Sequence, residues 1–395
     1  MGYIRGNKTK RNSMITNSVA ILGILTFNIY LAFQLERIPQ LKALSASLIV
    51  ILLGALEANF GLIPTSSAAP PLYDGIFAYV APLLIIFLML GIQLKSVRKA
   101  GIPMISSFFL GALGVMVGVT IGMLAINGHQ TFGDNFYVIG GMITATWTGG
   151  STNLNAVALT YNFAKEGSVY AAISAVDNII TALWLAACIL IPKMMRRRFP
   201  TQRQGAASDE NYAAQISEVS DVNPSDLGIL MAVGCAVLFV ADNLAAWVPS
   251  VHRIIWLSTI SLILAQIPAI QRLKGSRTLG MFCSYLFLSV IGAYCDIPVL
   301  LKDGYLAMNL MLFGIIVIGV HTVFQFGIAY LLKQDWDIMG IASQANVGGA
   351  ATALSVAKSL DRDDLGLGSI MIGLLGNAVG TYLGVVMAEF LKAYF

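Results

Sequence analysis

The sequence predicts an all-helical polytopic membrane protein with about 10–13 transmembrane segments, each near the ~20 apolar residues that a bilayer requires. Composition is the first reason: 57% of the 395 residues are hydrophobic and 11% are charged, whereas roughly 25% of a soluble globular protein is charged. The second reason is that long apolar runs recur from end to end. The third is a pair of glycine-containing polar stretches that interrupt two of these runs.

The expected segments follow the same order in both halves of the chain. In the first half we expect spans over 14–33, 41–60, 72–94 and 101–126, an interrupted segment over 136–163 and a span over 168–191. A polar linker, 192–224, follows. In the second half we expect spans over 226–247, 253–270, 278–295 and 305–332, an interrupted segment over 336–360 and a span over 364–393.

Composition also excludes several classes of protein. The net charge of +4 is small and comes from short loops, so it bears on topology and not on nucleic-acid binding. The four cysteines have no metal-ligand spacing and are expected to be small core residues. The basic N-terminus leads into an apolar run without a cleavage site, which favours a first span over a signal peptide. No arrangement typical of a hydrolase, metalloprotease or nucleotide-binding loop is present, so we expect no enzyme activity.

The first interrupted segment contains the stretch TATWTGGSTNLNAVAL, and the second contains IASQANVGGAATALSV. Backbone that leaves a helix at membrane depth is tolerated only inside protein or beside a wet cavity. We therefore expect binding sites here, the alternative being helix caps and close packing. The candidate residues for the substrate are Trp147, Thr148, Gly149, Gly150, Ser151, Asn155, Asn346, Gly348, Gly349 and Thr352.

A second constellation centres on Asp177, in the middle of the span 168–191. A carboxylate at membrane depth is costly and typically marks an ion or proton pathway. The second half has Gly376 in its place, so only one half carries the acid. The alternative is a structural Asp that is hydrogen-bonded to a neighbouring helix. The candidate residues for a coupling ion, Na⁺ or H⁺, are Thr152, Asn153, Asp177, Asn178, Gln344, Asn377 and Thr381.

The two halves are expected to form an inverted-topology repeat, 14–191 and 225–393. Gly149 and Gly348 are 199 positions apart (348 minus 149), and the same offset relates Gly167 to Gly366 and Asn178 to Asn377. Equivalent loops differ in charge: 95–99 is basic where its counterpart has Asp296, Lys302 and Asp303, and 272–277 is basic where its counterpart has Asp74. Basic loops stay cytoplasmic, which places equivalent loops on opposite faces.

Inversion requires an odd number of crossings in each half, and each half has six segments. If the interrupted segments are re-entrant hairpins, the basic loops 95–99, 193–198 and 272–277 all face the cytoplasm but the basic N-terminus does not. If these segments cross the membrane, the N-terminus obeys the rule and 95–99 breaks it. The sequence leaves both possibilities open.

The two breaks, TGGSTNLNAV and NVGGAATALSV, together with the hydropathy, resemble the YjcL-like family of uncharacterised membrane proteins. The layout is more distantly similar to the bile-acid/sodium symporter, glutamate/sodium symporter and cation/proton antiporter group. That resemblance implies two discontinuous helices in a mobile core (101–191 and 305–393) that moves against a static panel (14–94 and 225–295). It also implies a bacterial cytoplasmic membrane.

The resulting prediction is an elevator-type secondary transporter, a Na⁺- or H⁺-coupled symporter of a small organic anion or amino acid. The alternative is a cation (Na⁺)/proton antiporter that uses Asp177; a membrane scaffold or receptor that transports nothing is a third reading. The expected partners are the lipid bilayer and a small-molecule substrate, with no nucleic acid and no cofactor apart from the coupling ion. The oligomeric state, including a homodimer, is left open.

Overall fold

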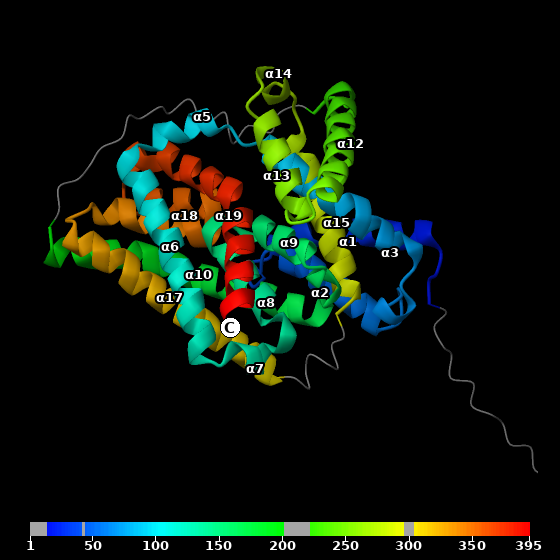
Figure 1. Cartoon of the computed structure of the whole chain (residues 1–395), viewed down its shortest axis with the longest axis horizontal. Coiled ribbons are helices and arrows are strands. Elements are labelled where there is room, and N and C mark those ends of the chain that lie inside the picture. The colour runs from blue at the N-terminus through cyan, green and yellow to red at the C-terminus, as the bar shows by residue number, and fades with distance from the viewer. Residues whose placement is uncertain (1–13, 42–43, 201–221, 296–303) are drawn as a thin grey trace, which may run out of the picture.

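The computed structural model describes residues 14–41, 44–200, 222–295 and 304–395, and within these ranges the chain is helical with no strand (Figure 1). The all-helical prediction is therefore confirmed. Most of the polar linker, the basic N-terminus and the loop with Asp296, Lys302 and Asp303 lie outside the described residues. Eight helical stretches in the described ranges are long and apolar enough to cross a membrane.

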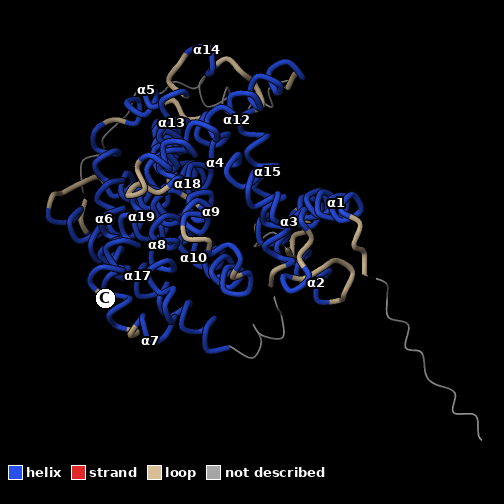
Figure 2. Tube along the Cα trace, turned by 45° about the vertical axis from the view of Figure 1, so that its right-hand side comes forward, coloured by secondary structure: helices blue, strands red, loops and turns tan. Residues whose placement is uncertain are grey.

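One group of helices, here called the first bundle, comes from the start of each half. It contains α1 (Ser18–Glu36), α2 (Ala46–Asn59), α3 (Pro71–Gly75), which a π-helical turn (Ile76–Val80) joins to α4 (Ala81–Leu90), α12 (Pro224–Trp247), α13 (Arg253–Leu264) and α15 (Ser276–Ala293). Small residues bring α2 and α15 together: a Cβ on Gly54 would collide with the carbonyl oxygen of Ser289, and one on Gly292 with that of Ile51. In Figure 2, α1, α2 and α3 lie at the right, apart from most of the other helices.

The remaining long helices form the second bundle. Its members are α6 (Ile102–Ala125), α8 (Phe136–Gly149), α9 (Ser151–Thr160), α10 (Gly167–Arg198), α17 (Gly304–Leu331), α18 (Trp336–Ser359) and α19 (Gly366–Tyr394). Glycines again set the closest approach. A Cβ on Gly380 of α19 would lie 2.9 Å from the carbonyl oxygen of Ala145, and one on Gly384 would lie 2.7 Å from that of Gly141. This spacing lets α19 run along the whole of α8.

The first interrupted segment is a re-entrant hairpin. Gly150 has φ 85° and ψ 167°, a conformation that only glycine adopts without strain, and it separates α8 from α9. The rings of Tyr137 and Tyr161, at the far ends of the two arms, have centroids 5.5 Å apart. Since α8 alone has 14 residues and is therefore about 21 Å long, the ends could not meet if the segment continued straight across.

The second interrupted segment has the same form. Gly349 has φ 79° and ψ −169° inside α18, so the chain reverses there. Asp335, just before α18, lies 3.0 Å from Arg362, just after it. Both segments thus enter and leave at one end of the bundle, which decides between the two possibilities that the sequence left open.

The two hairpins enter from opposite ends of the second bundle. Helix α10 begins soon after the first hairpin leaves, and its far end reaches the open end of the second: the carbonyl oxygen of Phe199 accepts a bond of 2.8 Å from Trp336, and Arg196 pairs with Asp337 at 2.8 Å. The hairpin tips therefore point toward each other from the two ends of α10.

The three basic loops gather at the end where the second hairpin enters. Arg362 binds Asp364, which leads into α19 beside the 95–99 loop; a Cβ on Gly368 would lie 3.4 Å from Ala100. The side chain of Gln266 then joins this loop to the 266–274 region through bonds of 3.0 Å to Leu94 and Ile92. Residues 193–198, expected in the polar linker, instead form the last turns of α10. The basic segments 95–99, 193–198 and 272–277 thus lie on one side, as the re-entrant arrangement predicts.

The backbone repeats its special conformations at the offset found in the sequence. Gly150 and Gly349 are 199 positions apart, and so are Asn162 (φ 55°) and Asp361 (φ 57°). Helices α10 and α19 begin at the matched residues Gly167 and Gly366. Positions 199 residues apart in the sequence thus share the same backbone conformation at these three places.

Candidate functional site

Asp177 lies in the middle of α10 and binds the tip of the first hairpin. Its Oδ1 accepts hydrogen bonds from Trp147 (2.8 Å) and Thr146 (3.2 Å), and its Oδ2 accepts one from Ser151 (3.1 Å). Thr181, one turn further along α10, also hydrogen-bonds to this carboxylate. Only 4% of Asp177 is exposed. Because Ser151 is the first residue of α9, the carboxylate also lies at the positive end of a helix dipole.

A small polar cavity of about 50 Å³ lies beside this carboxylate, between the two bundles. A water molecule needs on the order of 10–15 Å³ of such space, so the cavity has room for a few waters or a small ion. Its polar lining comes from α2, α9, α10 and α15: Ser47, Ser151, Thr152, Asn155, Tyr170, Ser174, Asp177, Asn178 and Ser284. Hydrogen bonds of Asn155 to Ser284 (3.3 Å) and to Tyr170 link its walls.

The tip of the second hairpin carries a different set of side chains. The atoms nearest to the position of a Cβ on Gly348 are the amide nitrogen of Gln344, the hydroxyl of Thr352 and the methyl group of Thr181. Gln344 is fully buried, and neither atom of its amide has a hydrogen-bond partner among the described residues. An unpaired buried polar group costs about 1–3 kcal/mol, so this amide marks a place where a polar ligand would be stabilised.

The two tips are one helical turn apart. On α10, Asp177 binds the first tip and Thr181 touches the second. On α19, a Cβ on Gly376 would lie 2.9 Å from the carbonyl oxygen of Thr148 in the first hairpin, whereas Gly373 lies directly against Ala350 in the second. Groups from both hairpins thus converge near the middle of the bundle, where one ligand could contact both.

Several predicted residues have their side chains bonded elsewhere. Thr148 donates to the carbonyl oxygen of Thr144 in its own helix. Asn153 accepts bonds from the backbone and hydroxyl of Thr381, at 3.1 and 2.6 Å, and thereby attaches α9 to α19. Asn346 donates to the carbonyl oxygen of Phe108 in α6. Asn153 and Asn346 thus hold neighbouring helices together, Thr148 bonds within α8, and none of the three side chains lines the polar cavity.

The remaining predicted residues lie close to the tips. Thr152 and Asn178 line the polar cavity. The Oδ1 atom of Asn377 lies 3.6 Å from the position of a Cβ on Gly150. The predicted constellation is therefore partly assembled, with one cluster at each tip and Asn346 outside both.

Six contributors were not predicted from the sequence, among them Tyr170 and Ser174 of α10, which line the polar cavity. Thr146 and Thr181 bind Asp177, and the spacing of one helical turn between Asp177 and Thr181 is a signal that could have found the latter. Ser47 and Ser284 reach the cavity from the first bundle, and nothing in their local sequence distinguishes them from other serines in apolar helices.

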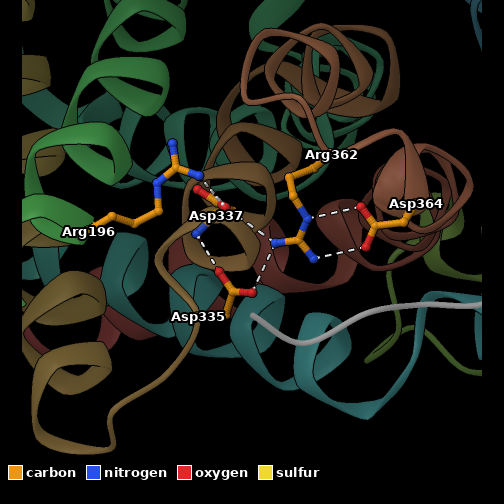
Figure 3. Close-up of polar contacts among 5 residues, drawn as sticks. All are labelled: Arg196, Asp335, Asp337, Arg362 and Asp364. Atoms are coloured by element: carbon orange, nitrogen blue, oxygen red, sulfur yellow. Dashed lines mark hydrogen bonds and ion pairs between the residues drawn. The ribbon is translucent and has the colours of Figure 1, made fainter. Parts of the chain in front are cut away.

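An ion-pair cluster closes the open end of the second hairpin (Figure 3). Arg362 binds Asp335 at 3.0 Å, Asp337 at 3.3 Å and Asp364 at 2.9 Å, while Arg196 of α10 binds Asp337 from the other side. Burial disfavours the charged form of Arg362, but the hydrogen bonds to Asp364 and Asp335 outweigh it and raise its pKa. The cluster fixes both arms of the hairpin to the end of α10.

No group of three or more His, Cys, Asp or Glu side chains in the described ranges is arranged to hold a metal ion. His321 is fully buried, with its Nδ1 3.0 Å from the carbonyl oxygen of Gly111 and its Nε2 2.8 Å from the hydroxyl of Ser343. Trp184 of α10 donates to the same hydroxyl at 3.1 Å. This histidine therefore joins α6, α17 and α18 through polar contacts.

Comparison with known proteins agrees with the resemblance seen in the sequence. The chain is similar to the uncharacterized membrane protein YjcL of Bacillus subtilis (strain 168), with 25% identity over 378 residues that cover 91% of this chain and 93% of that protein. The model of a family described as "Protein of unknown function (DUF819)" matches residues 20–394. The chain is therefore a member of the DUF819 family of proteins and is similar to YjcL along nearly its whole length.

Proposed function

We propose that this protein is an elevator-type secondary transporter that couples Na⁺ or H⁺ to the uptake of a small organic anion or amino acid. The observation that carries the proposal is the meeting of two re-entrant hairpins from opposite ends of the second bundle, beside a buried carboxylate. Transporters with inverted-topology repeats bind their solutes at the membrane midplane, where discontinuous helices expose backbone groups.

The energetics of the bilayer support a binding role for the tips. Each unsatisfied backbone group in lipid costs several kcal/mol, and irregular backbone is tolerated at this depth only inside protein or beside water. Ser151 and Thr152, immediately after the first break, line the polar cavity. A protein that only needed to span the membrane would have no use for two such breaks.

The two bundles correspond to the panel and the core that the proposal requires. At the end opposite the basic loops, two of the contacts between them are exposed ion pairs: Lys165 of the core pairs with Asp74 of the panel at 3.3 Å, and Glu389 of the core pairs with His252 at 3.1 Å. Exposed pairs of this kind contribute only about 0.2–1 kcal/mol. Ion pairs of this strength would oppose a movement of the core along the panel only slightly.

The charge distribution supports an orientation. The loops 95–99, 193–198 and 272–277, which are rich in Lys and Arg, lie at one end of the molecule. Basic loops remain on the cytoplasmic side. We infer that the second hairpin enters from the cytoplasm and the first from outside, with the protein in a bacterial cytoplasmic membrane.

The coupling ion is assigned to the surroundings of Asp177. Among the described residues that line the polar cavity, Asp177 supplies the carboxylate, and Ser151, Thr152, Asn155 and Asn178 supply hydroxyl and amide oxygens. In transporters with discontinuous helices, oxygen atoms beside the helix breaks coordinate Na⁺. Because the carboxylate borders a cavity large enough for water, a cation/proton antiporter that works through Asp177 is the second candidate function.

Proteoliposomes that contain the purified protein distinguish the two candidates. The symporter is expected to accumulate a carboxylate or amino acid only with an inward Na⁺ or H⁺ gradient, and Asp177→Asn is expected to reduce that uptake at least tenfold. Lumenal pH is followed in the same vesicles with Na⁺ and no organic solute. A pH change that requires Asp177 in those vesicles would instead establish the antiporter, and vesicles that show neither response would exclude both transport functions.

A further inference from the structure

The two hairpin tips differ in one respect that the repeat makes visible. At the offset of 199 residues, Ser151 corresponds to Ala350 and Asp177 corresponds to Gly376. In the first hairpin, the carboxylate of Asp177 accepts a bond from Ser151 at the start of the second arm. In the second hairpin, the residue at the matched position has no side chain. In the first hairpin, the positive N-terminal end of the second arm is therefore neutralised by a carboxylate of the protein. In the second hairpin, the residue at the equivalent position does not neutralise it.

The second arm of the second hairpin offers the features that bind an anion. It runs from Ala350 to Ser359 after the break at Gly349, so the first N–H groups of this ten-residue helix lie at the tip. These groups and the helix dipole attract negative charge. A Cβ placed on Gly349 would meet nothing within 4 Å, which shows that there is open space directly beside the tip.

A second and independent observation points to a ligand at the same place. Gln344 is 0% exposed and neither its Nε2 nor its Oε1 has a partner in the described part of the chain. Its Nε2 and the hydroxyl of Thr352 are the two atoms closest to the position of a Cβ on Gly348. The amide thus offers a donor group, Nε2, and an acceptor atom, Oε1, beside the start of the helical arm.

We propose that the tip of the second hairpin binds the carboxylate of the transported solute, in the role that Asp177 fills at the first hairpin. That the bound solute is also transported rests on the proposed function. The carboxylate accepts hydrogen bonds from the N–H groups at the start of the arm and from Nε2 of Gln344. Oε1 of Gln344 accepts a bond from a donor on the solute, which favours an amino acid or a hydroxy acid over a simple carboxylate.

The position of Asp177 explains why such a solute would need a coupling cation. Thr181 touches both Asp177 and the second tip, so a bound carboxylate would lie about one helical turn from the carboxylate of Asp177. Two negative charges this close repel each other in a medium of low dielectric constant. A Na⁺ ion or a proton at Asp177 removes that repulsion, and the binding of the solute thereby depends on the cation.

The test measures thermal unfolding of the full-length protein in detergent, because a ligand of the native state raises its stability by mass action. The probes are the sodium salts of formate, acetate, succinate, glutamate and malate, compared with sodium chloride at the same Na⁺ concentration. We expect glutamate or malate to give the largest stabilisation. Gln344→Glu, which is isosteric and places a negative charge at the tip, is expected to weaken carboxylate binding at least tenfold.

A second variant keeps the test informative if the buried charge prevents folding. Gln344→Met removes the donor and the acceptor without adding charge and is expected to abolish the preference for glutamate or malate over acetate. Gln325→Met is the matched control: Gln325 is also a fully buried amide, but it donates to the carbonyl oxygen of Ser107 in α6, outside the tips. The control variant is expected to respond to the probes as the wild type does.

Three results would overturn the assignment: no carboxylate stabilises the wild type, both Gln344 variants keep the wild-type response to glutamate and malate and its preference over acetate, or Gln344→Glu strengthens the response to Na⁺. The last result would make the tip a cation site. The outcome is separable from that of the proposed function. Carboxylate binding without uptake in proteoliposomes would contradict the proposed transport function and leave the binding site at the second tip supported. Gradient-driven uptake that is unchanged in Gln344→Met would support the transport function and contradict the binding site.

Discussion

Replacement of Gly349 by alanine tests the re-entrant geometry at the smallest possible scale. The residue has φ 79° and ψ −169°, a region that is essentially restricted to glycine and that costs other residues about 1–3 kcal/mol. A Cβ there would meet nothing within 4 Å, so no steric clash adds to this value. The entire effect of Gly349→Ala is therefore conformational.

The expected destabilisation of ~1–3 kcal/mol corresponds to roughly a 5- to 150-fold change in the equilibrium constant. Gly150→Ala is expected to behave alike, since φ is 85° and the new Cβ would lie 3.6 Å from Asn377, an ordinary contact. Gly319→Ala is the control. Gly319 lies within α17, also with nothing near its Cβ position, and alanine there is expected to be neutral or stabilising by up to about 1 kcal/mol.

The measurement is the equilibrium unfolding of each variant by denaturant in the same detergent, with helix content followed by circular dichroism. The two tip variants are expected to unfold at lower denaturant concentration than the wild type, and Gly319→Ala at the same or a higher one. If Gly349→Ala were as stable as the control, residue 349 would have an ordinary helical conformation and α18 would not reverse there.

Three further results are expected. With the exposed native Cys235 replaced by serine, cysteines at Asn135 and Glu166 should react with an impermeant maleimide from the same side of sealed vesicles, whereas labelling from opposite sides would mean that the first segment crosses the membrane. Arg362→Gln should destabilise the protein by about 3 kcal/mol, because it leaves buried aspartates with less compensation, and Asp335→Asn in the same chain should restore part of the loss; additive effects of the two substitutions would show that the pair is not coupled. Any stabilisation of the wild type by Na⁺ in thermal unfolding should be lost in Asp177→Ala, and an unchanged response to Na⁺ would place the ion elsewhere.

The positions of the helices and of their breaks could be predicted from the sequence. The expected spans 101–126 and 305–332, for example, correspond to α6 (Ile102–Ala125) and α17 (Gly304–Leu331). This succeeded because every span must satisfy its own backbone hydrogen bonds in lipid and cover them with apolar side chains, which leaves a signal in any window of about 20 residues. The breaks could also be located from the glycine pairs, because only glycine adopts the positive φ of the second glycine in each pair without strain.

The direction of the chain after each break could not be predicted from the same residues. A glycine with positive φ is compatible with a kink and with a reversal, and the distinction depends on what the second arm packs against. In this fold the outcome is visible only from contacts between distant residues, such as Tyr137 with Tyr161 and Asp335 with Arg362. Hydropathy is similar for a hairpin and for a crossing helix, so it contains no information about this choice.

For the candidate site, too, the sequence determined one part and the tertiary structure the other. The sequence by itself determined which residues are polar at membrane depth, including Asp177, Gln344 and Asn346, because polarity and position are local properties. Only the tertiary structure decided their partners: Asp177 binds the first hairpin, Asn346 points to α6, and Gln344 lies unpaired at the second tip. The physical reason is that a side chain's hydrogen bonds depend on which helices surround it, and those neighbours come from the opposite half of the chain.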